Sequence, residues 1–451
     1  IKNTPADGLI TGLSYVNSDL FVKEKTKTAI MHYDYMVLAG TQGINNHKKL
    51  DRMIDVIRGL KVPLIFFCEG GGGRPGDVDA GDQNIAGLNI PSFHDFARLS
   101  GEVPLVGIGS GRLFAGNAAL LGCCDVIIGT RDLNLGMGGP AMIEGGGLGV
   151  YKPEEVGPTS VQYPNGVIDI LVDNEDDAIV IAKKYLSYFQ GNLGSWEAPE
   201  VENLRYVIPE NRLEVYDIRE VIDNIADIGS VLEIKAGFAK GMFTGFIRVK
   251  GKPLGLIANN PLFLAGAIDS DGADKASRFI KLCENYNIPI LSLCDTPGMM
   301  VGPEIEKTGL VRHCCRLFLA GANVTVPMMT IVLRKAYGLG AQAMAGGSFM
   351  APQFVVGWPT AEIGAMGLEG AVKLGYRKEL EAESDVEKKE KLFKKLVDDL
   401  YEKGKAINAA SLLEFDTVLD PIESRDWISM VVESPINSSE KVPKNRYIDS
   451  W

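Results

Sequence analysis

The chain has 451 residues, of which 46% are hydrophobic and 23% charged, as is typical of a globular protein with enough apolar residues for two domains. Its formal net charge of −12 argues against non-specific nucleic-acid binding, because that binding needs a basic surface. No apolar run reaches the ~18 residues that a membrane-spanning helix needs, and no signal peptide is visible, so no membrane span is expected.

The cysteines and histidines indicate neither disulfide bonds nor a metal site. The seven cysteines are odd in number and contain no CxxC spacing, which indicates reduced thiols inside a cell. The four histidines form no ligand-like pair, so no metal site is predicted. The chain begins at Ile1, without a methionine and within a running pattern. We therefore expect a natural N-terminus further upstream and a cytoplasmic protein, with the mitochondrial matrix as the alternative.

The first half of the chain reads as strands that alternate with helices. A polar turn is followed by apolar residues at helical spacing, which are Leu50, Met53, Ile54 and Ile57. A buried-type strand, "LIFFCE", and a glycine-rich turn come next. The stretch "SGEVPLVGIGSGRLFAGNAALLGCC" then predicts a strand, a connecting turn and a helix that opens with small residues.

The second half repeats this order of elements. Its helix carries apolar residues at the same spacing, which are Ala276, Phe279, Ile280 and Cys283, and the strand "ILSLCD" follows. The stretch "AGANVTVPMMTIVLRKAYGLGAQAMAGG" predicts a second strand and a second helix that opens with small residues. The alternation predicts an α/β fold with parallel, right-handed units in two similar domains. The boundary is expected in the polar stretch 191–215, which gives domains 1–205 and 206–451.

One segment near the C-terminus differs in character from the rest. Residues 377–403, "RKELEAESDVEKKEKLFKKLVDDLYEK", are dense in charges of both signs. This pattern predicts a helix that is exposed to solvent.

Two of the predicted helices begin with small residues. One begins at Ala115 and Gly116, and the other at Gly338, Leu339 and Gly340. A helix N-terminus presents unpaired N–H groups, and small residues let a ligand approach them closely. Two backbone donors aimed at one point bind an oxyanion, so the repeat suggests one developing negative oxygen in each domain. The alternative is close packing of helix on strand, which also favours glycine and alanine.

The sequence gives only weak matches to other nucleotide-binding or catalytic motifs. "EGGGGRPGD" follows a strand but lacks the lysine and hydroxyl residue of a P-loop, and "GIGSGRLFAG" has no acidic ribose partner. Glu69, Asp295 and Glu362 are candidate acids, and the alternative is that they are strand-end carboxylates in ion pairs or turns. Without an evident protein acid or base, a cofactor or the substrate is expected to supply the base.

Several stretches in chain order carry a resemblance to a known family. They include "DYMVLAGTQG", "LIANNPLFLAGAIDSDGADKASRFIKLCENYNIPILSLCDTPG", "LRKAYGLGAQAM" and "WPTAEIGAMGLEGAV". These stretches resemble the carboxyltransferase component of biotin-dependent acyl-CoA carboxylases, and the likeness covers nearly the whole chain. The resemblance implies two duplicated crotonase-like domains of ββα units. It also implies transfer of CO2 from carboxybiotin to the α-carbon, or a vinylogous carbon, of an acyl-CoA. Biotin and CoA are therefore the implied cofactors.

The resemblance also implies roles for residues and partners. By position, Ala115 and Gly116 would serve the thioester, and Leu339 and Gly340 would serve biotin. Gly338 would give room there, and Ala341 and Gln342 would lie beside the bound groups. The family often has Gly-Gly at the first pair and Gly-Gly-Ala at 338–340, so the identity of the inward N–H groups is open within 338–341. The implied partners are a biotin carboxyl carrier and a biotin carboxylase, and the implied assembly is a homo-hexamer built as a dimer of trimers.

Three alternatives to an acyl-CoA carboxyltransferase remain. The first is the same reaction run as a decarboxylation linked to a membrane pump. The second is a crotonase-type hydratase or isomerase, against which the duplication speaks. The third is an inactive scaffold for a biotinyl domain, against which the small-residue helix starts in both halves speak. The acyl chain length is left open.

Overall fold

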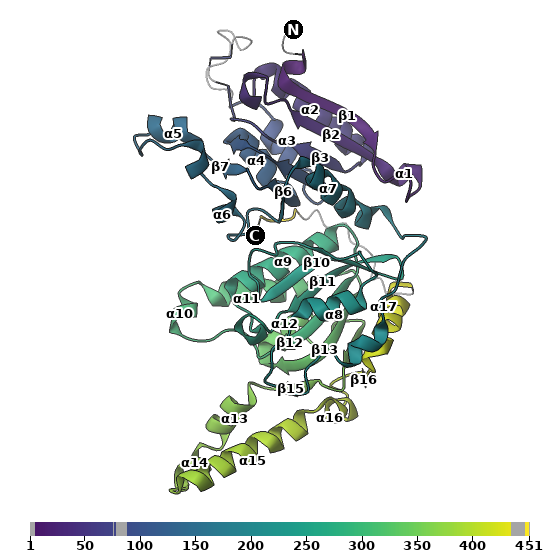
Figure 1. The fold of residues 1–451 in the computed structure, drawn as a ribbon, viewed down its shortest axis with the longest axis vertical. Coiled ribbons are helices and arrows are strands. Elements are labelled where there is room, and N and C mark those ends of the chain that lie inside the picture. The colour runs from purple at the N-terminus through teal and green to yellow at the C-terminus, as the bar shows by residue number, and fades with distance from the viewer. Residues whose placement is uncertain (1–4, 75, 78–87, 434–446, 451) are drawn as a thin grey trace. The chain divides into compact units, whose positions relative to one another are not determined.

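The computed structural model describes residues 5–74, 76–77, 88–433 and 447–450 (Figure 1). The chain forms two compact units. The first consists of residues 1–194, 234–238 and 443–450, and the second consists of residues 195–233 and 239–442, with residue 451. Each unit has its own sheet and its own buried core.

The sheet of the first unit has six strands, with one antiparallel pair at its edge and parallel strands beyond it. In spatial order these strands are β1 (Leu9–Tyr15), β2 (Lys27–Tyr33), β3 (Leu64–Phe67), β4 (Leu105–Gly109), β6 (Val126–Thr130) and β8 (Ile170–Val172). A second, two-stranded parallel sheet joins β5 (Arg112–Phe114) to β7 (Asn134–Gly136).

The helices of the first unit bury the residues that the sequence pattern predicts. They are α1 (Lys23–Thr26), α2 (Ile44–Leu60), α3 (Ser92–Ala97), α4 (Gly116–Gly122), α5 (Pro140–Gly145), α6 (Thr159–Gln162) and α7 (Glu175–Gln190). The buried face of α2 includes Leu50, Met53, Ile54 and Ile57, which confirms the predicted helix and its inward side. These residues share one core cluster with Leu64 and Phe66 of β3, because a helical stripe of apolar residues is buried most fully against a sheet.

The sheet of the second unit also combines an antiparallel edge with parallel strands. In spatial order its strands are β16 (Thr417–Val418), β14 (Phe354–Gly357), β13 (Met328–Tyr337), β12 (Ile290–Thr296), β11 (Lys252–Asn259), β10 (Met242–Val249) and β9 (Leu232–Glu233). The short strand β15 (Glu362–Gly364) pairs in parallel with the last residues of β13. The fold is therefore mixed α/β with largely parallel sheets, as the alternation of elements predicts.

The helices of the second unit follow the same logic. They are α8 (Ile218–Ile225), α9 (Ser270–Asn285), α10 (Pro303–Glu306), α11 (Leu310–Ala322), α12 (Gly338–Met344), α13 (Leu368–Gly375), α14 (Arg377–Ala382), α15 (Val386–Gly404), α16 (Ala406–Ser411) and α17 (Ser424–Glu433). The predicted inward residues of α9, from Ala276 to Cys283, are all buried. The core of this unit includes Trp358, which is fully buried and donates its indole N–H to Ser424 Oγ at 3.0 Å.

The two units repeat one order of elements around the same unusual turn. In each, an antiparallel pair (β1–β2 or β10–β11) leads through a short turn into a long helix and a parallel strand. The turns have the sequence Leu-Ala-Gly at residues 38–40 and 264–266. All three residues have positive φ angles in both copies, with Ala39 at 55° and Ala265 at 53°. Positive φ is uncommon outside glycine, so a shared run of three is a specific structural repeat.

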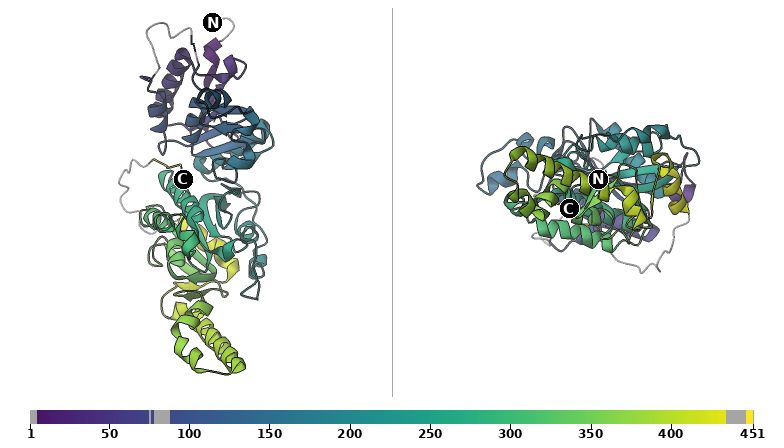
Figure 2. Two further views of the ribbon diagram at one scale, coloured as in Figure 1. Left: turned by 90° about the vertical axis from the view of Figure 1, so that its left-hand side faces the viewer. Right: turned by 90° about the horizontal axis from the view of Figure 1, so that it is seen from below.

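The charged segment 377–403 is not the single exposed helix that its composition predicts. It forms α14 and α15, separated at Asp385, whose side chain caps α15 by accepting the N–H of Lys388 at 3.1 Å. With α13 these helices form a projection from the second unit (Figure 2). Its inner face buries a small core of apolar residues, which are Tyr337, Leu368, Val372, Leu380 and Val397. The charges are the outer face of an amphipathic arrangement. Among the described helices, none is long and apolar enough to cross a membrane.

Candidate active site

The first predicted helix start lies where β5 gives way to α4. Ala115 is the N-cap residue and has φ 54° and ψ −122°, which is a rare conformation for a residue with a side chain. Its N–H donates to the carbonyl of Gly136 at 3.1 Å, which continues the pairing of β5 with β7. The N–H of Gly116 donates to no acceptor among the described residues. The expectation that both N–H groups are available therefore differs from the structure at Ala115, because the side sheet uses that donor.

The glycine turn after β3 is held against this helix start. A Cβ atom added to Gly72 would lie 2.5 Å from the Cβ of Ala115 and 3.0 Å from the nitrogen of Gly116. Asn117, which is fully buried, accepts the N–H of Gly72 at 2.9 Å and donates to the carbonyls of Gly40 and Cys68. A Cβ on Gly116 would lie 2.4 Å from Gln42 Oε1. Glycine at position 72 is therefore favoured by its positive φ and by the close backbone of Gly116, whereas at position 116 a Cβ would displace the side chain of Gln42.

The second predicted helix start lies at the end of β13. Tyr337 is the N-cap residue of α12, and Gly338 follows with φ 53°. Leu339 and Gly340 belong to the first turn of the helix, whose N–H groups have no acceptor within it. Neither N–H group donates to any other described residue. This helix start therefore offers two adjacent backbone donors, as the sequence suggests.

Close packing explains why two of these residues are glycine. A Cβ on Gly338 would lie 2.8 Å from the carbonyl oxygen of Ala365, and one on Gly340 would lie 2.6 Å from Cα of Gly298. Leu339 instead points outward with 62% of its surface exposed. The packing alternative thus accounts for the glycines, and first-turn N–H groups without acceptors occur in any helix, so both interpretations fit this helix start. Ala341 is buried, and Gln342 is exposed with no side-chain hydrogen bond to the described residues.

Asp295 is part of a buried ion network behind the second helix start. Its carboxylate accepts from the hydroxyl of Tyr216 at 2.8 Å and from Arg334 Nε at 3.1 Å. The other oxygen accepts the backbone N–H of Lys335 at 3.1 Å. Asp295 is fully buried and Arg334 is 2% exposed. Burial, with the negative charge of Asp295 beside it, raises the pKa of Tyr216 well above its usual value, so the hydroxyl stays a donor. Asp295 is therefore occupied as a structural ion and is not placed as a base.

Glu362 forms a second buried contact at the same helix start. The hydroxyl of Tyr337 donates to Glu362 Oε1 at 2.5 Å. The other oxygen, Oε2, is buried and has no hydrogen-bond partner among the described residues. Burial raises the pKa of Glu362 above its usual value, although the bond from Tyr337 acts in the opposite direction.

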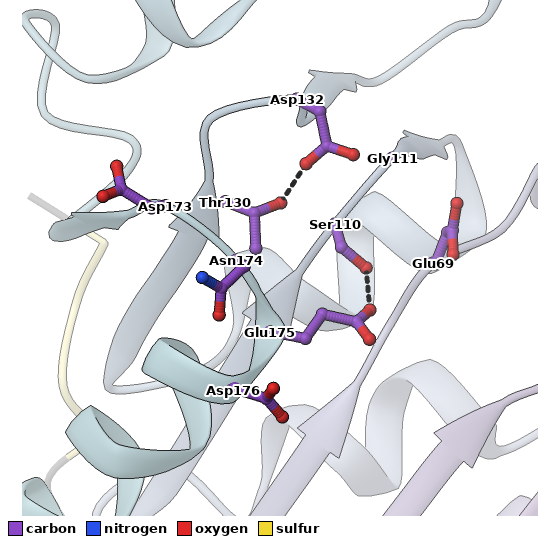
Figure 3. Close-up of a pocket in the computed structure, with 9 residues that line it drawn as sticks. All are labelled: Glu69, Ser110, Gly111, Thr130, Asp132, Asp173, Asn174, Glu175 and Asp176. Carbon is purple, nitrogen blue, oxygen red and sulfur yellow. Dashed lines mark hydrogen bonds between the residues drawn. The ribbon is translucent and has the colours of Figure 1, made fainter.

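Glu69 belongs to the first unit, where it lines an acidic pocket at the carboxyl ends of the parallel strands (Figure 3). Its carboxylate accepts the N–H of Arg112 at 3.3 Å, and burial raises its pKa. The pocket is lined by Glu69, Ser110, Gly111, Thr130, Asp132, Asp173, Asn174, Glu175 and Asp176. Its carboxylates repel anions, so it does not suit a phosphate group. Within the described residues, no group of three or more His, Cys, Asp or Glu side chains is arranged to hold a metal ion.

Sequence reasoning did not find the residues that fix the two helix starts. Asn117, Tyr216 and Tyr337 each hold a backbone or a charge in place. Asn117 and Tyr337 stand within the quoted helix-start stretches, but no spacing marks any of the three as functional. Asn117 gave one signal, since it is a polar side chain inside an otherwise apolar, small-residue helix start. The hydrogen-bond partners of Asp295 and Glu362 lie far from these carboxylates in the sequence, so no local pattern indicated them.

The comparisons with known proteins agree across the chain. The family model described as the carboxyl transferase domain matches residues 7–447. The methylmalonyl-CoA carboxyltransferase 12S subunit of Propionibacterium freudenreichii is 31% identical over 98% of this chain and 84% of that protein. An uncharacterised carboxylase of Bacillus subtilis, YngE, is 33% identical over 94% of this chain and 83% of that protein.

Solved structures give the same result. A single-chain, multi-domain long-chain acyl-CoA carboxylase matches with a TM-score of 0.89 and 53% identity, over 95% of this chain and 42% of that chain. The transcarboxylase 12S structure, described as a hexamer with methylmalonyl-CoA bound, matches with a TM-score of 0.83 and 30% identity, over 98% of this chain and 85% of that chain. The chain belongs to the carboxyl transferase domain family, and it is a carboxyltransferase of the biotin-dependent acyl-CoA carboxylases.

Proposed function

We propose that each of the two helix starts binds one developing negative oxygen of the carboxyl-transfer reaction. The observation that carries this proposal is that Gly116, Leu339 and Gly340 present N–H groups without acceptors among the described residues, one set in each unit. Preorganised backbone donors stabilise charge as it develops without having to reorganise. The carboxyl transfer itself follows from the family.

At the first helix start, Gly116 donates to the thioester oxygen of the acyl-CoA as its α-carbon loses a proton. Ala115, whose own N–H is bonded to Gly136, acts through its backbone shape, which turns the chain so that Gly116 begins the helix. At the second, Leu339 and Gly340 donate to the ureido oxygen of biotin. Gly338 leaves room for that approach, and Ala341 and Gln342 lie beside the bound group.

The proposal needs no carboxylate base from the described residues. Asp295 is held by Arg334 and Tyr216, and one oxygen of Glu362 is bonded to Tyr337. When bound, carboxybiotin would release its CO2, the freed ureido nitrogen of biotin would accept the proton from the α-carbon or a vinylogous carbon, and that carbon would then form its new bond to the CO2. The protein residues bind and orient the two oxygens.

The finer architecture and the partners belong to the same proposal. We propose two crotonase-like domains at 1–205 and 206–451, and the shared Leu-Ala-Gly turn with three positive φ angles supports their common origin. We propose a biotin carboxyl carrier and a biotin carboxylase as partners, on the same chain or on others, and a hexamer built from two trimers. The 42% coverage of the multi-domain carboxylase supports a fused arrangement. Location in the cytoplasm or the mitochondrial matrix stays a prediction.

We propose a long-chain acyl-CoA as the substrate, because the 53% identical structure is that of a long-chain acyl-CoA carboxylase. The test is a panel of acetyl-, propionyl-, methylcrotonyl- and long-chain acyl-CoA with a carboxylated biotin carrier. The largest kcat/KM is expected for a long chain. A preference for acetyl- or propionyl-CoA would contradict this assignment while leaving the carboxyltransferase activity intact.

Gln342 should tune acyl preference. Gln342 is exposed, and it is the fifth residue of α12, two residues after the proposed biotin donor Gly340. An unpaired amide facing an apolar tail costs about 1–3 kcal/mol, and each methylene that fits gains about 0.8 kcal/mol. Gln342→Ala should therefore change the ratio of kcat/KM between acetyl-CoA and longer acyl-CoAs by roughly tenfold. Equal changes at every chain length would show that Gln342 does not line the acyl pocket.

Activity should depend on assembly. If each unit supplies one oxygen-binding site and opposed chains complete each active centre, an isolated chain lacks a complete centre. The molar mass from light scattering and the rate of carboxyl transfer per chain should fall together across a dilution series, because the oligomer dissociates. A monomer that still transfers carboxyl groups at the full rate per chain would refute this expectation.

A further inference from the structure

Tyr337 and Glu362 form a buried polar contact, which packing alone does not require. Glu362 is 1% exposed, yet only one of its oxygens is bonded to a described residue. A buried carboxyl oxygen without a partner is unfavourable, and such groups in native structures need an explanation. Replacing Tyr337 and Glu362 by apolar residues would remove the unsatisfied oxygen. Its presence suggests that the contact has a use.

The contact lies at the proposed biotin donors. Tyr337 is both the last residue of β13 and the N-cap residue of α12, directly before Gly338. Glu362 is the first residue of β15, which pairs with β13 from Lys335 to Tyr337. Two tethers, the strand pairing and the side-chain hydrogen bond, therefore fix the chain immediately before Leu339 and Gly340.

The same tyrosine ring also belongs to the core of the helical projection. Tyr337 is 3% exposed and shares a cluster with Leu368, Val372 and Val397 of α13 and α15. At the other end of this projection, Lys405 pairs by an isolated bridge with Glu362 itself. The projection α13–α15 thus begins and ends beside the Tyr337–Glu362 contact.

We propose that Tyr337 and Glu362 are positioning residues for the biotin half of the reaction. Their hydrogen bond holds the first turn of α12 at the distance and angle that its N–H donors need. This inference rests on the proposed role of Leu339 and Gly340, and it extends that role to side chains that touch neither substrate. Misplacing a reacting group by about 1 Å can cost 10²-fold in rate, so a lost tether has a measurable effect.

The test compares Tyr337→Phe, Glu362→Leu and Glu362→Gln, with Tyr376→Phe as the matched control. Tyr376 packs at the edge of the same small core and makes no hydrogen bond through its hydroxyl to the described residues. Free biotin is the carboxyl acceptor in the reverse reaction with a carboxylated acyl-CoA. Tyr337→Phe and Glu362→Leu should lower kcat or raise KM for biotin by roughly ten- to a hundredfold. KM for the acyl-CoA should stay close to wild type, while the thermal midpoint should fall modestly because each change leaves a buried polar partner unpaired.

The outcomes distinguish a positioning role of Tyr337 and Glu362 from a merely structural one. Glu362→Gln keeps an acceptor for the tyrosine hydroxyl and should restore most of the activity that Glu362→Leu loses. Equal losses of kcat/KM for biotin and for the acyl-CoA would show a merely structural role and overturn the proposal. If Tyr337→Phe and Glu362→Leu were as active as Tyr376→Phe, the proposal would be overturned too. Leu339→Pro distinguishes failure of the positioning role from failure of the proposed oxygen site. If it abolishes turnover while Tyr337→Phe does not, only the positioning role fails, and if neither lowers turnover, the proposed oxygen site fails.

Discussion

Leu339→Pro should lower kcat for carboxyl transfer by about 10²–10³-fold, as removal of one oxyanion donor does in other enzymes. Proline has no N–H, so the change deletes one of the two proposed donors to biotin. The position suits the test, because proline is tolerated in the first turn of a helix and the Leu339 side chain is 62% exposed. Gly340 is less suitable, since any Cβ there would lie 2.6 Å from Gly298.

The control is Leu339→Ala, which keeps the N–H and removes most of the side chain. It should turn over within a few-fold of wild type, and both variants should unfold near the wild-type temperature. Turnover by Leu339→Pro within about tenfold of the alanine variant would contradict the proposed donor role.

Asp295→Leu should destabilise the second unit by about 3–5 kcal/mol, the usual cost of removing one partner from a buried ion pair. The change leaves Arg334 buried at 2% exposure without its carboxylate and removes the acceptor of the Tyr216 hydroxyl. For a unit of this size, the loss corresponds to a fall of roughly 10 °C in the thermal midpoint. Calorimetry of the purified chain measures it.

The matched control for this prediction is an exposed ion pair of the same unit. Glu304 pairs with Lys307 at 2.7 Å, and their side chains are 81% and 70% exposed. Glu304→Gln should shift the midpoint little, because exposed pairs contribute about 0–1 kcal/mol. An unchanged midpoint in Asp295→Leu would show that the Asp295 network does not stabilise the fold.

Local sequence patterns were sufficient for the elements whose packing is local. The apolar spacing of α2 and α9 predicted their buried faces, because a helix that covers a sheet must turn one continuous stripe inward. The small residues predicted both helix starts, since a Cβ would meet the side chain of Gln42 at Gly116 and the backbone of Gly298 at Gly340. The repeat of strand, helix and glycine turn predicted two similar α/β halves.

Contacts between distant residues could not be predicted in this way. The network around Asp295 joins residues 216, 295 and 334, and no spacing rule connects them. The bond from Ala115 N–H to Gly136 depends on the pairing of β5 with β7, which short strands do not specify. In the segment 377–403 the density of charge concealed an apolar face, and the cap at Asp385 that divides it is a single side chain.

We propose that backbone oxygen sites carry the transfer of a carboxyl group from biotin to an acyl-CoA in this chain. The most direct measurement supplies a carrier domain with ¹⁴C-labelled carboxybiotin and follows the label on a long-chain acyl-CoA by chromatography of the thioester. Label is expected on the acyl-CoA with wild-type protein and with Leu339→Ala, and labelling should be about 10²–10³-fold slower with Leu339→Pro. Folded, oligomeric wild-type protein that labels none of the acyl-CoAs in the panel would contradict the proposal, and so would equal labelling rates for the two variants.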